Sequence, residues 1–250
     1  MSELLIEIIK KKETILVLSL DVVKKKKFFK ILKKCAPYIC ALKLHLDIYP
    51  FMTSRVLKRI IKISKKYNFI IIEDRKFSDI GNTQRLQAEA LLKKGITYFT
   101  SHIFTGEKAL RSLPIESKIF LVSDMSCEDA FFSDIDNLNL KKEMHKKSCE
   151  YYESIHQVIG FVSQYRINID SGRIPFILRP GIRLSAKTKN KDTMGQNYNY
   201  PMVDSGVCWV VGREICEAES PEVIAKQYKN IFKAQKYLWF KNETSHITAV

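Results

Sequence analysis

The chain has 250 residues, and 46% of them are hydrophobic, which is enough for a sizeable core and argues against a disordered protein. It carries 42 basic and 27 acidic residues, a net charge of +15, which is compatible with nucleic acid, an acidic surface or an anionic small substrate as partner. Most lysines occur in helix-like runs typical of solvated faces, without a zinc-ligand spacing or a compact Arg/aromatic cluster, so we expect no nucleic-acid partner.

The cysteines and the apolar runs bear on the compartment. Six cysteines are spread along the chain without C-x-x-C pairs, which argues against a disulfide scaffold or a zinc site and favours reduced thiols in the cytoplasm. Residues 1–12 carry Glu3 and Glu7 within an apolar stretch and predict an amphipathic helix instead of a secretory signal. No apolar run approaches the roughly 18 residues of a membrane span, so we expect no membrane partner.

The first third of the chain alternates between amphipathic and strand-like segments, and polar side chains end the strands. The first strand runs into Ser19 and Asp21, and the second carries Lys43 and His45 between leucines. One face of the second strand is therefore unusually polar and basic. The expected helices span residues 1–12, 24–34 and 53–67, and the expected strands span residues 15–21 and 41–47.

The stretch 69–83 is the most informative of the sequence. Three isoleucines predict a strand buried on both faces, and they run straight into Asp74, Lys76 and Asp79. Residues two apart on a strand share a face, so we expect Asp74 and Lys76 to point the same way. A buried ion pair without function remains an alternative, but two carboxylates that bracket one lysine at a strand end favour catalysis.

The alternation continues to the end of the chain. The remaining helices are expected at residues 83–94, 106–113, 137–157 and 221–238, and the remaining strands at 96–104, 118–126, 158–166, 176–182 and 207–213. Eight strands with helices after most of them predict an α/β fold of the (β/α)₈ TIM-barrel type, with residues 1–250 as a single domain. An open doubly wound sheet is the alternative, but no G-x-G-x-x-G motif follows the first strand.

Two further segments have distinct expected roles. Residues 183–206 form a long polar connection that leaves little room for a helix, which is typical of a lid, and residues 239–250 form a C-terminal tail. The last strand ends in Gly212 and Arg213, and loops after strands seven and eight of such barrels often hold a phosphate. An arginine there can bind phosphate in a bidentate manner, although a surface ion pair is the simpler explanation for Arg213 alone.

These segments together resemble a known family. The run Glu73-Asp-Arg-Lys-Phe-Ser-Asp-Ile-Gly-Asn-Thr83 is similar to the signature of orotidine 5′-phosphate decarboxylases of the eukaryotic type, and the resemblance covers residues 8–240. Six shorter matches occur in the family's order: Leu18–Asp21, Leu42–Asp47, Asp124–Ser126, Arg179–Ile182, Met194–Tyr198 and Val211–Arg213. The length leaves no room for an orotate phosphoribosyltransferase domain, so we expect the monofunctional enzyme.

The resemblance implies a homodimer that converts orotidine 5′-monophosphate to UMP without a metal or an organic cofactor. Lys43, Asp74 and Lys76 would form the catalytic array, in which Lys76 protonates C6 of the pyrimidine. Asp79 would complete the array from the neighbouring subunit, and Thr83 would reach the ribose across the same interface. The other implied substrate-binding residues are Ser19, Asp21, His45, Ser126, Pro180, Gln196, Tyr198, Gly212 and Arg213.

Two departures from the family pattern concern the substrate site. Glu214 follows Arg213 where the family usually has glycine, which puts a negative side chain beside the expected phosphate site, and Arg179 replaces the usual threonine before Pro180. Two other functions therefore stay open. One is a related barrel decarboxylase or aldolase that acts on a sugar phosphate with magnesium, and the other is a catalytically weakened nucleotide-binding protein.

Overall fold

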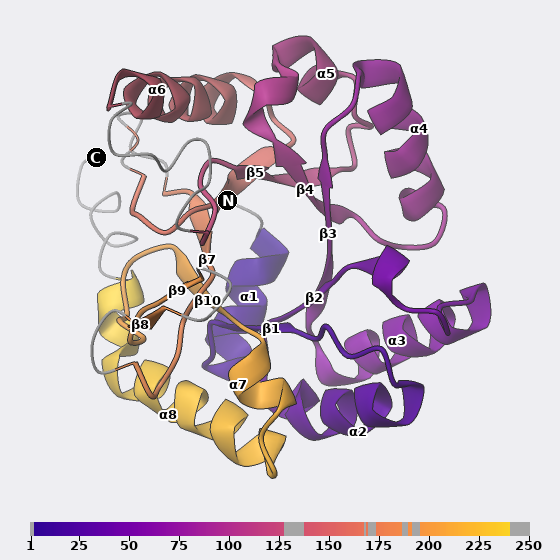
Figure 1. Ribbon diagram of the computed structural model, residues 1–250, viewed down its shortest axis with the longest axis vertical. Coiled ribbons are helices and arrows are strands. Elements are labelled where there is room, and N and C mark those ends of the chain that lie inside the picture. Colours follow the sequence, from indigo (N-terminus) through magenta and orange to yellow (C-terminus); the bar gives the residue numbers. More distant parts are fainter. Residues whose placement is uncertain are drawn as a thin grey trace, which may run out of the picture.

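Eight parallel strands form the centre of the molecule in the computed structural model, and the first strand pairs with the last to close a barrel (Figure 1). The structure describes residues 3–127, 138–167, 169, 174–186, 190–191 and 196–240. Closure confirms the (β/α)₈ prediction and rules out the open sheet. The barrel strands, in spatial order, are β1 (Leu16–Ser19), β10 (Val207–Val211), β7 (Phe176–Arg179), β6 (Val158–Val162), β5 (Lys118–Val122), β4 (Tyr98–His102), β3 (Ile70–Phe77) and β2 (Ala41–Leu44).

The strands are apolar because both of their faces are covered, by the barrel interior on one side and by helices on the other. Ile70, Ile71 and Ile72 of β3 are all buried, as expected from their continuous run. The paired part of most strands ends two to four residues before the expected boundary, because the polar residues that follow leave the ladder and line a cavity.

Most of the helices surround the barrel, whereas α1 lies behind the strands near the centre of the view (Figure 1). In α3, Thr53 caps the first turn by accepting a hydrogen bond from the Val56 N–H at 3.3 Å, and Asn68 ends the helix with φ of 52°. The remaining helices are α1 (Glu3–Lys12), α2 (Lys25–Cys35), α4 (Gly81–Leu92), α5 (Glu107–Arg111), α6 (Leu138–Ser154), α7 (Arg213–Cys216) and α8 (Pro221–Phe240), and α3 spans Ser54–Tyr67. None of the helices in the described part of the chain is long and apolar enough to cross a membrane.

Several helices differ from the sequence prediction. Helix α4 begins at Gly81 and not at Thr83, and α7 was not predicted. Helix α8 continues through Trp239 and Phe240, the first two residues of the expected tail, because Trp239 is buried and its indole N–H donates to the Val207 carbonyl at 2.9 Å. The rest of the expected tail, residues 241–250, lies outside the described residues.

The long connection after β7 contains a small antiparallel pair that the sequence did not predict. It joins β8 (Asn190–Lys191) to β9 (Asn197–Tyr198). Residues 181–183 and 197–199 are also held together, because the Asn199 N–H donates to the Gly181 carbonyl at 2.7 Å and the Arg183 N–H donates to the Asn199 carbonyl at 2.9 Å. The two described ends of this connection therefore form one unit beside the barrel opening.

Candidate active site

The carboxyl ends of the barrel strands surround a cavity of about 240 Å³. Twelve of the fourteen residues proposed from the sequence line it, although they come from positions 19 to 213 of the chain. They are Ser19, Asp21, Lys43, His45, Asp74, Lys76, Ser126, Pro180, Gln196, Tyr198, Gly212 and Arg213. The parallel barrel explains this convergence, because every strand delivers its C-terminal end to the same face.

Asp74 lies at the centre of a buried charged array. Its carboxylate accepts from the Lys43 ammonium, and its Oδ2 atom lies 2.9 Å from Lys76 Nζ. His45 Nε2 is 3.2 Å from the same Oδ2 atom and 3.2 Å from Lys43 Nζ, so His45 lies beside the array. Only 6% of the Asp74 side chain is exposed, so these interactions take place with little solvent screening.

The array perturbs the pKa values of its members. Burial opposes ionisation of Asp74, but the charges of Lys43 and Lys76 and the hydrogen bond from His45 outweigh it and hold the pKa of the carboxyl well below its usual range. Burial lowers the pKa of the Lys76 ammonium, with Lys43 adding to the effect, and Asp74 only partly offsets it. Lys76 is therefore a better proton donor than an exposed lysine, while Asp74 stays ionised.

Thr100 of β4 fixes the geometry of the array, and the sequence analysis missed it. This fully buried hydroxyl donates to Asp74 Oδ1 at 2.8 Å and accepts from the Lys76 backbone N–H at 2.9 Å. Lys76 has a left-handed φ of 49°, and the β3–β4 register shifts between Glu73 and Phe77. A non-glycine residue in this region is held there by its surroundings, and Thr100 supplies one of the restraints.

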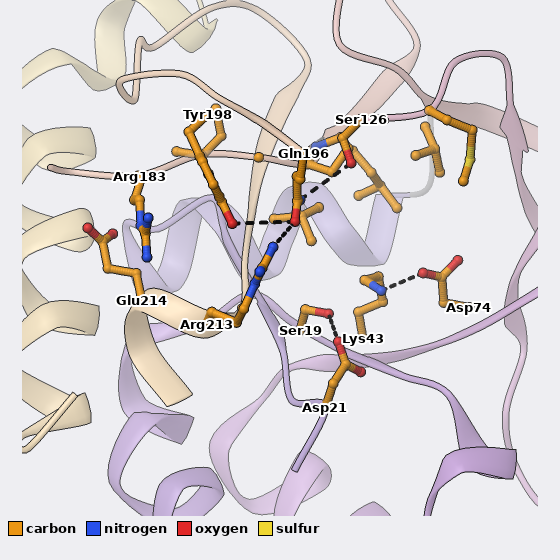
Figure 2. A pocket seen from close by; sticks show the side chains of 18 of the residues that line it. Ser19, Asp21, Lys43, Asp74, Ser126, Arg183, Gln196, Tyr198, Arg213 and Glu214 are labelled. Atoms are coloured by element: carbon orange, nitrogen blue, oxygen red, sulfur yellow. Dashed lines mark hydrogen bonds and ion pairs between the residues drawn. The ribbon is translucent and has the colours of Figure 1, made fainter. Parts of the chain in front are cut away.

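A second polar cluster lies across the cavity from Asp74 (Figure 2). The Arg213 guanidinium donates to Gln196 Oε1, the Tyr198 hydroxyl donates to the same oxygen at 3.5 Å, and Gln196 Nε2 lies 3.4 Å from Ser126 Oγ. Arg213 comes from the end of β10, whereas Gln196 and Tyr198 come from the long connection after β7. An arginine, an amide and a phenol at one end of a cavity fit a phosphate group.

The Glu214 side chain also lines the cavity, but its carboxylate is occupied by hydrogen-bond donors of its own chain. Its carboxylate accepts from the backbone N–H groups of Leu184 at 3.0 Å and Ser185 at 3.2 Å, from the Ser185 hydroxyl at 3.3 Å and from the Tyr228 hydroxyl. The negative charge is thus engaged by four donors. Glu214 connects the residues after β7 to α7 and α8, close to Arg213.

Gly181 allows the two ends of the long connection to approach each other. Its φ is +70°, and a Cβ atom there would lie 2.3 Å from the Asn197 carbonyl oxygen. A side chain at this position is therefore excluded by both conformation and space. Pro180 and Gly181 thereby bring Tyr198 and Gln196 over the cavity.

Two predicted site residues lie outside the cavity of this chain. Asp79 is exposed, and its Oδ1 atom accepts from its own neighbour, the Ile80 N–H, at 2.7 Å. Thr83 is half-buried on α4 and does not line the cavity either. Conversely, Asp124 and Arg183 line the cavity without having been proposed. Asp124 could have been proposed, because it begins the Asp124–Ser126 match to the family. Nothing in the sequence pattern distinguishes Arg183 from the other basic residues of its loop.

The sequence matches a family of known proteins. Residues 14–228 match the model of the orotidine 5′-phosphate decarboxylase / HUMPS family. The chain belongs to this family. An orotidine 5′-phosphate decarboxylase of Rhizomucor pusillus is 31% identical over 242 residues, which covers 90% of this chain and 87% of that protein.

Two solved structures have the same fold. The orotidine 5′-phosphate decarboxylase of Pyrococcus horikoshii OT3 matches with a TM-score of 0.64 and 25% identity, covering 87% of this chain and 99% of that one. The UMP synthase of Leishmania donovani matches with a TM-score of 0.72 and 17% identity, covering 94% of this chain and 56% of that one. At 17% identity the second match supports the fold alone.

Proposed function

We propose that this protein decarboxylates orotidine 5′-monophosphate to UMP and carbon dioxide, in de novo pyrimidine synthesis. The observation that carries the proposal is the pairing of two clusters in one cavity. The Lys43–Asp74–Lys76 array suits negative charge at a reacting carbon, and the Arg213–Gln196–Tyr198 cluster suits a phosphate. The relative from Rhizomucor pusillus carries the name of this activity.

The residue types fit the chemistry. When the bond between C6 and the carboxylate breaks, the electron pair stays on C6, and the ring delocalises it poorly. The Lys76 ammonium stabilises this charge and gives its proton to C6, so that UMP and carbon dioxide leave and the amine is reprotonated from water. The lowered pKa of Lys76 favours this transfer.

Asp74 affects the same step through its charge. Two like charges about 4 Å apart repel by roughly 4 kcal/mol at an effective dielectric constant near 20. A substrate carboxylate beside the ionised Asp74 is therefore destabilised, and the repulsion disappears as neutral carbon dioxide departs. Lys43 and His45 keep Asp74 ionised and oriented.

The phosphate end of the substrate supplies binding energy. Contacts to Arg213, Gln196 and Tyr198 order a loop over the cavity, so part of the energy of phosphate binding positions the pyrimidine against Lys76. Asp21, whose Oδ2 atom accepts from the Ser19 hydroxyl at 2.8 Å, lies between the two clusters at the end of β1 and suits a ribose hydroxyl.

A turnover assay in EDTA tests the proposal against its rivals. Loss of orotate-ring absorbance from orotidine 5′-monophosphate is expected with EDTA present, whereas a magnesium-dependent sugar-phosphate enzyme of the same barrel type would leave it unchanged. Lys76→Ala is expected to abolish turnover while UMP still binds. A variant as active as the parent would contradict the role of Lys76, and UMP binding without turnover in the parent would identify a nucleotide-binding protein.

The proposal includes a homodimer in which Asp79 and Thr83 serve the partner's cavity. Asp79 is exposed and outside the cavity of its own chain. The apolar side chains of Ile80, which follows it, and of Leu86 on α4 are 71% and 52% exposed. Such a surface is typical of an interface. Mixing inactive Lys76→Ala and Asp79→Ala chains is expected to restore partial activity in hybrid dimers, and a mixture without activity would count against a shared site.

The remaining expectations belong to the same proposal. The chain acts as one decarboxylase domain in the cytoplasm, requires no metal or organic cofactor, and uses residues 183–206 as a phosphate-binding lid. If no metal is required, activity should remain complete after exhaustive dialysis against EDTA. Fractionation of the source cells tests the cytoplasmic location.

A further inference from the structure

Glu73 is a buried carboxyl that the proposed reaction does not use. It precedes Asp74 on β3, but it is only 2% exposed and does not line the cavity. Neighbouring residues of a strand point to opposite faces, so Glu73 faces away from the charged array although its backbone is joined to it. Burying a carboxyl costs free energy unless its oxygens accept hydrogen bonds, so the contacts of Glu73 indicate its role.

The contact of Glu73 is the backbone of the residue that follows His45. The Leu46 N–H donates to both carboxyl oxygens, at 3.2 Å to Oε1 and 3.3 Å to Oε2. After the end of β2, η2 (Leu46–Ile48) forms a short 3₁₀ turn in which the Ile48 N–H donates to the His45 carbonyl at 3.2 Å. The first N–H groups of a helical turn have no acceptor within the turn, so Glu73 supplies from β3 the acceptor that Leu46 lacks.

This hydrogen bond fixes the chain beside the array. His45 Nε2 lies 3.2 Å from Asp74 Oδ2 and 3.2 Å from Lys43 Nζ, so a shift of the His45 backbone would change how the imidazole meets the carboxylate. Leu44 and Glu73 form the last pair of the β2–β3 register. The Glu73 carboxyl therefore joins the two strand ends at the point where the backbone ladder stops.

We propose that Glu73 is a positioning residue: by anchoring the chain directly after His45, it holds this imidazole against Asp74. The inference rests on the proposed function, since it takes the array around Asp74 to be the catalytic centre. Glu73 itself touches neither the cavity nor the reacting atoms, and it acts through the backbone at the end of β2.

The anchor is sensitive to pH because Glu73 can ionise. The charged or titratable groups around it are Asp47, Tyr49, Asp74 and Arg75. Burial raises the pKa of the Glu73 carboxyl to about 8 against the hydrogen bond from Leu46, and the charges of the two aspartates act in the same direction as burial. Burial also raises the pKa of the Tyr49 hydroxyl, which stays neutral. Ionisation of Glu73 places a second buried negative charge beside Asp74, which favours movement of the Glu73 carboxylate towards water and releases the anchor.

The test compares Glu73→Gln, which keeps an acceptor for Leu46 but cannot ionise, with Glu73→Ala, which removes the acceptor. At pH 7 we expect kcat for orotidine 5′-monophosphate to fall about 10-fold in Glu73→Ala and to stay close to that of the parent in Glu73→Gln. Above pH 8 the kcat of the parent should fall relative to that of Glu73→Gln, and titration of Lys76 affects both proteins alike. If Glu73→Ala does not fold, this pair decides, and identical profiles of kcat against pH would overturn the inference.

A double-mutant cycle with His45→Ala separates positioning from a general loss of stability. If Glu73 acts through His45, Glu73→Ala lowers kcat about 10-fold in the parent but much less in the His45→Ala background. Equal losses in both backgrounds would overturn the inference, because Glu73 would then support the fold in general. Glu107→Gln, which neutralises an exposed carboxylate paired with Arg111 on α5, is the matched control and should leave kcat unchanged.

Amide hydrogen exchange tests the anchor without turnover. We expect the Leu46 amide to exchange at least about 10-fold faster in Glu73→Ala than in the parent or Glu73→Gln at pH 7, and equal rates would overturn the inference. If the parent does not turn over orotidine 5′-monophosphate, the decarboxylase proposal fails, but the exchange rate of Leu46 still reports on the anchor. If the parent is active and Glu73→Ala changes neither kcat nor this rate, the decarboxylase proposal stands and the inference about Glu73 is wrong.

Discussion

Replacing Thr100 by valine is the sharpest test of how the catalytic array is held. Valine has nearly the shape of threonine, so the change removes one hydroxyl from a fully buried position without opening a large cavity. Two hydrogen bonds are lost, the one donated to Asp74 Oδ1 at 2.8 Å and the one accepted from the Lys76 N–H at 2.9 Å.

The magnitude follows from the character of these bonds. A hydrogen bond to an ionised group contributes about 1.5–3 kcal/mol and a neutral one about 1 kcal/mol, so the free energy of unfolding should fall by about 2.5–4 kcal/mol. The Lys76 backbone, at φ of 49°, also loses a restraint. Because small displacements of a reacting group are costly, we expect kcat to fall by about 10- to 100-fold at a temperature where the variant stays folded.

Urea unfolding and steady-state turnover of orotidine 5′-monophosphate measure the two effects. Thr97→Val makes the same chemical change just before β4, at a hydroxyl that forms no hydrogen bond with the described residues, and should alter neither quantity by much. If Thr100→Val matches the parent in both stability and kcat, the reasoning that Thr100 holds Asp74 and Lys76 is refuted.

Three further predictions follow from described contacts. Burial raises the pKa of the Glu73 carboxyl to about 8 from an ordinary value of 4.5. Its contribution to stability is therefore complete below pH 4.5 and is lost as the pH rises through about 8. Glu73→Gln should flatten this part of a plot of unfolding free energy against pH, and an unchanged slope would contradict the assignment. Glu214→Ala should raise KM for orotidine 5′-monophosphate by about 10-fold because the carboxylate anchors Leu184, whereas a lower KM would mean that its charge repels the phosphate. Gly181→Ala should weaken UMP binding by at least about 10-fold in a titration, since its Cβ would collide with the Asn197 carbonyl, and parent-like affinity would show that the loop can relax.

The barrel and the charged array could be predicted because their signals are local. Ile70–Ile72 mark a buried strand, and Asp74 and Lys76 follow at a spacing that places both on one side. In the structure the Asp74 carboxylate contacts the ammonium groups of both Lys43 and Lys76. Residue roles in catalysis and the sharing of Asp79 between subunits stay predictions.

The supporting residues could not be predicted because their partners are chosen by tertiary pairing. Thr100 is one threonine in an apolar strand, and it meets Asp74 only through the shifted register between β3 and β4. Arg183 belongs to a basic loop without periodicity, and it reaches Tyr198 only because residues 181–183 pair with residues 197–199. Glu214 follows Arg213 in the sequence, but the four donors to its carboxylate belong to Leu184, Ser185 and Tyr228, and no sequence spacing shows that these residues lie near it.

Closure of the barrel through β1 and β10 also bears on how the protein is made. Leu16 of β1 pairs with Trp209 of β10, and Arg213 follows at the end of β10. A ribosome-bound chain that stops before β10 therefore has an open sheet whose two edge strands, β1 and β7, are unpaired. Contacts between such distant residues are costly to form early. The Lys43–Asp74–Lys76 array lies on neighbouring strands that pair with each other, so it does not depend on this closure, whereas Arg213 reaches the cavity only when β10 pairs with β1 and β7.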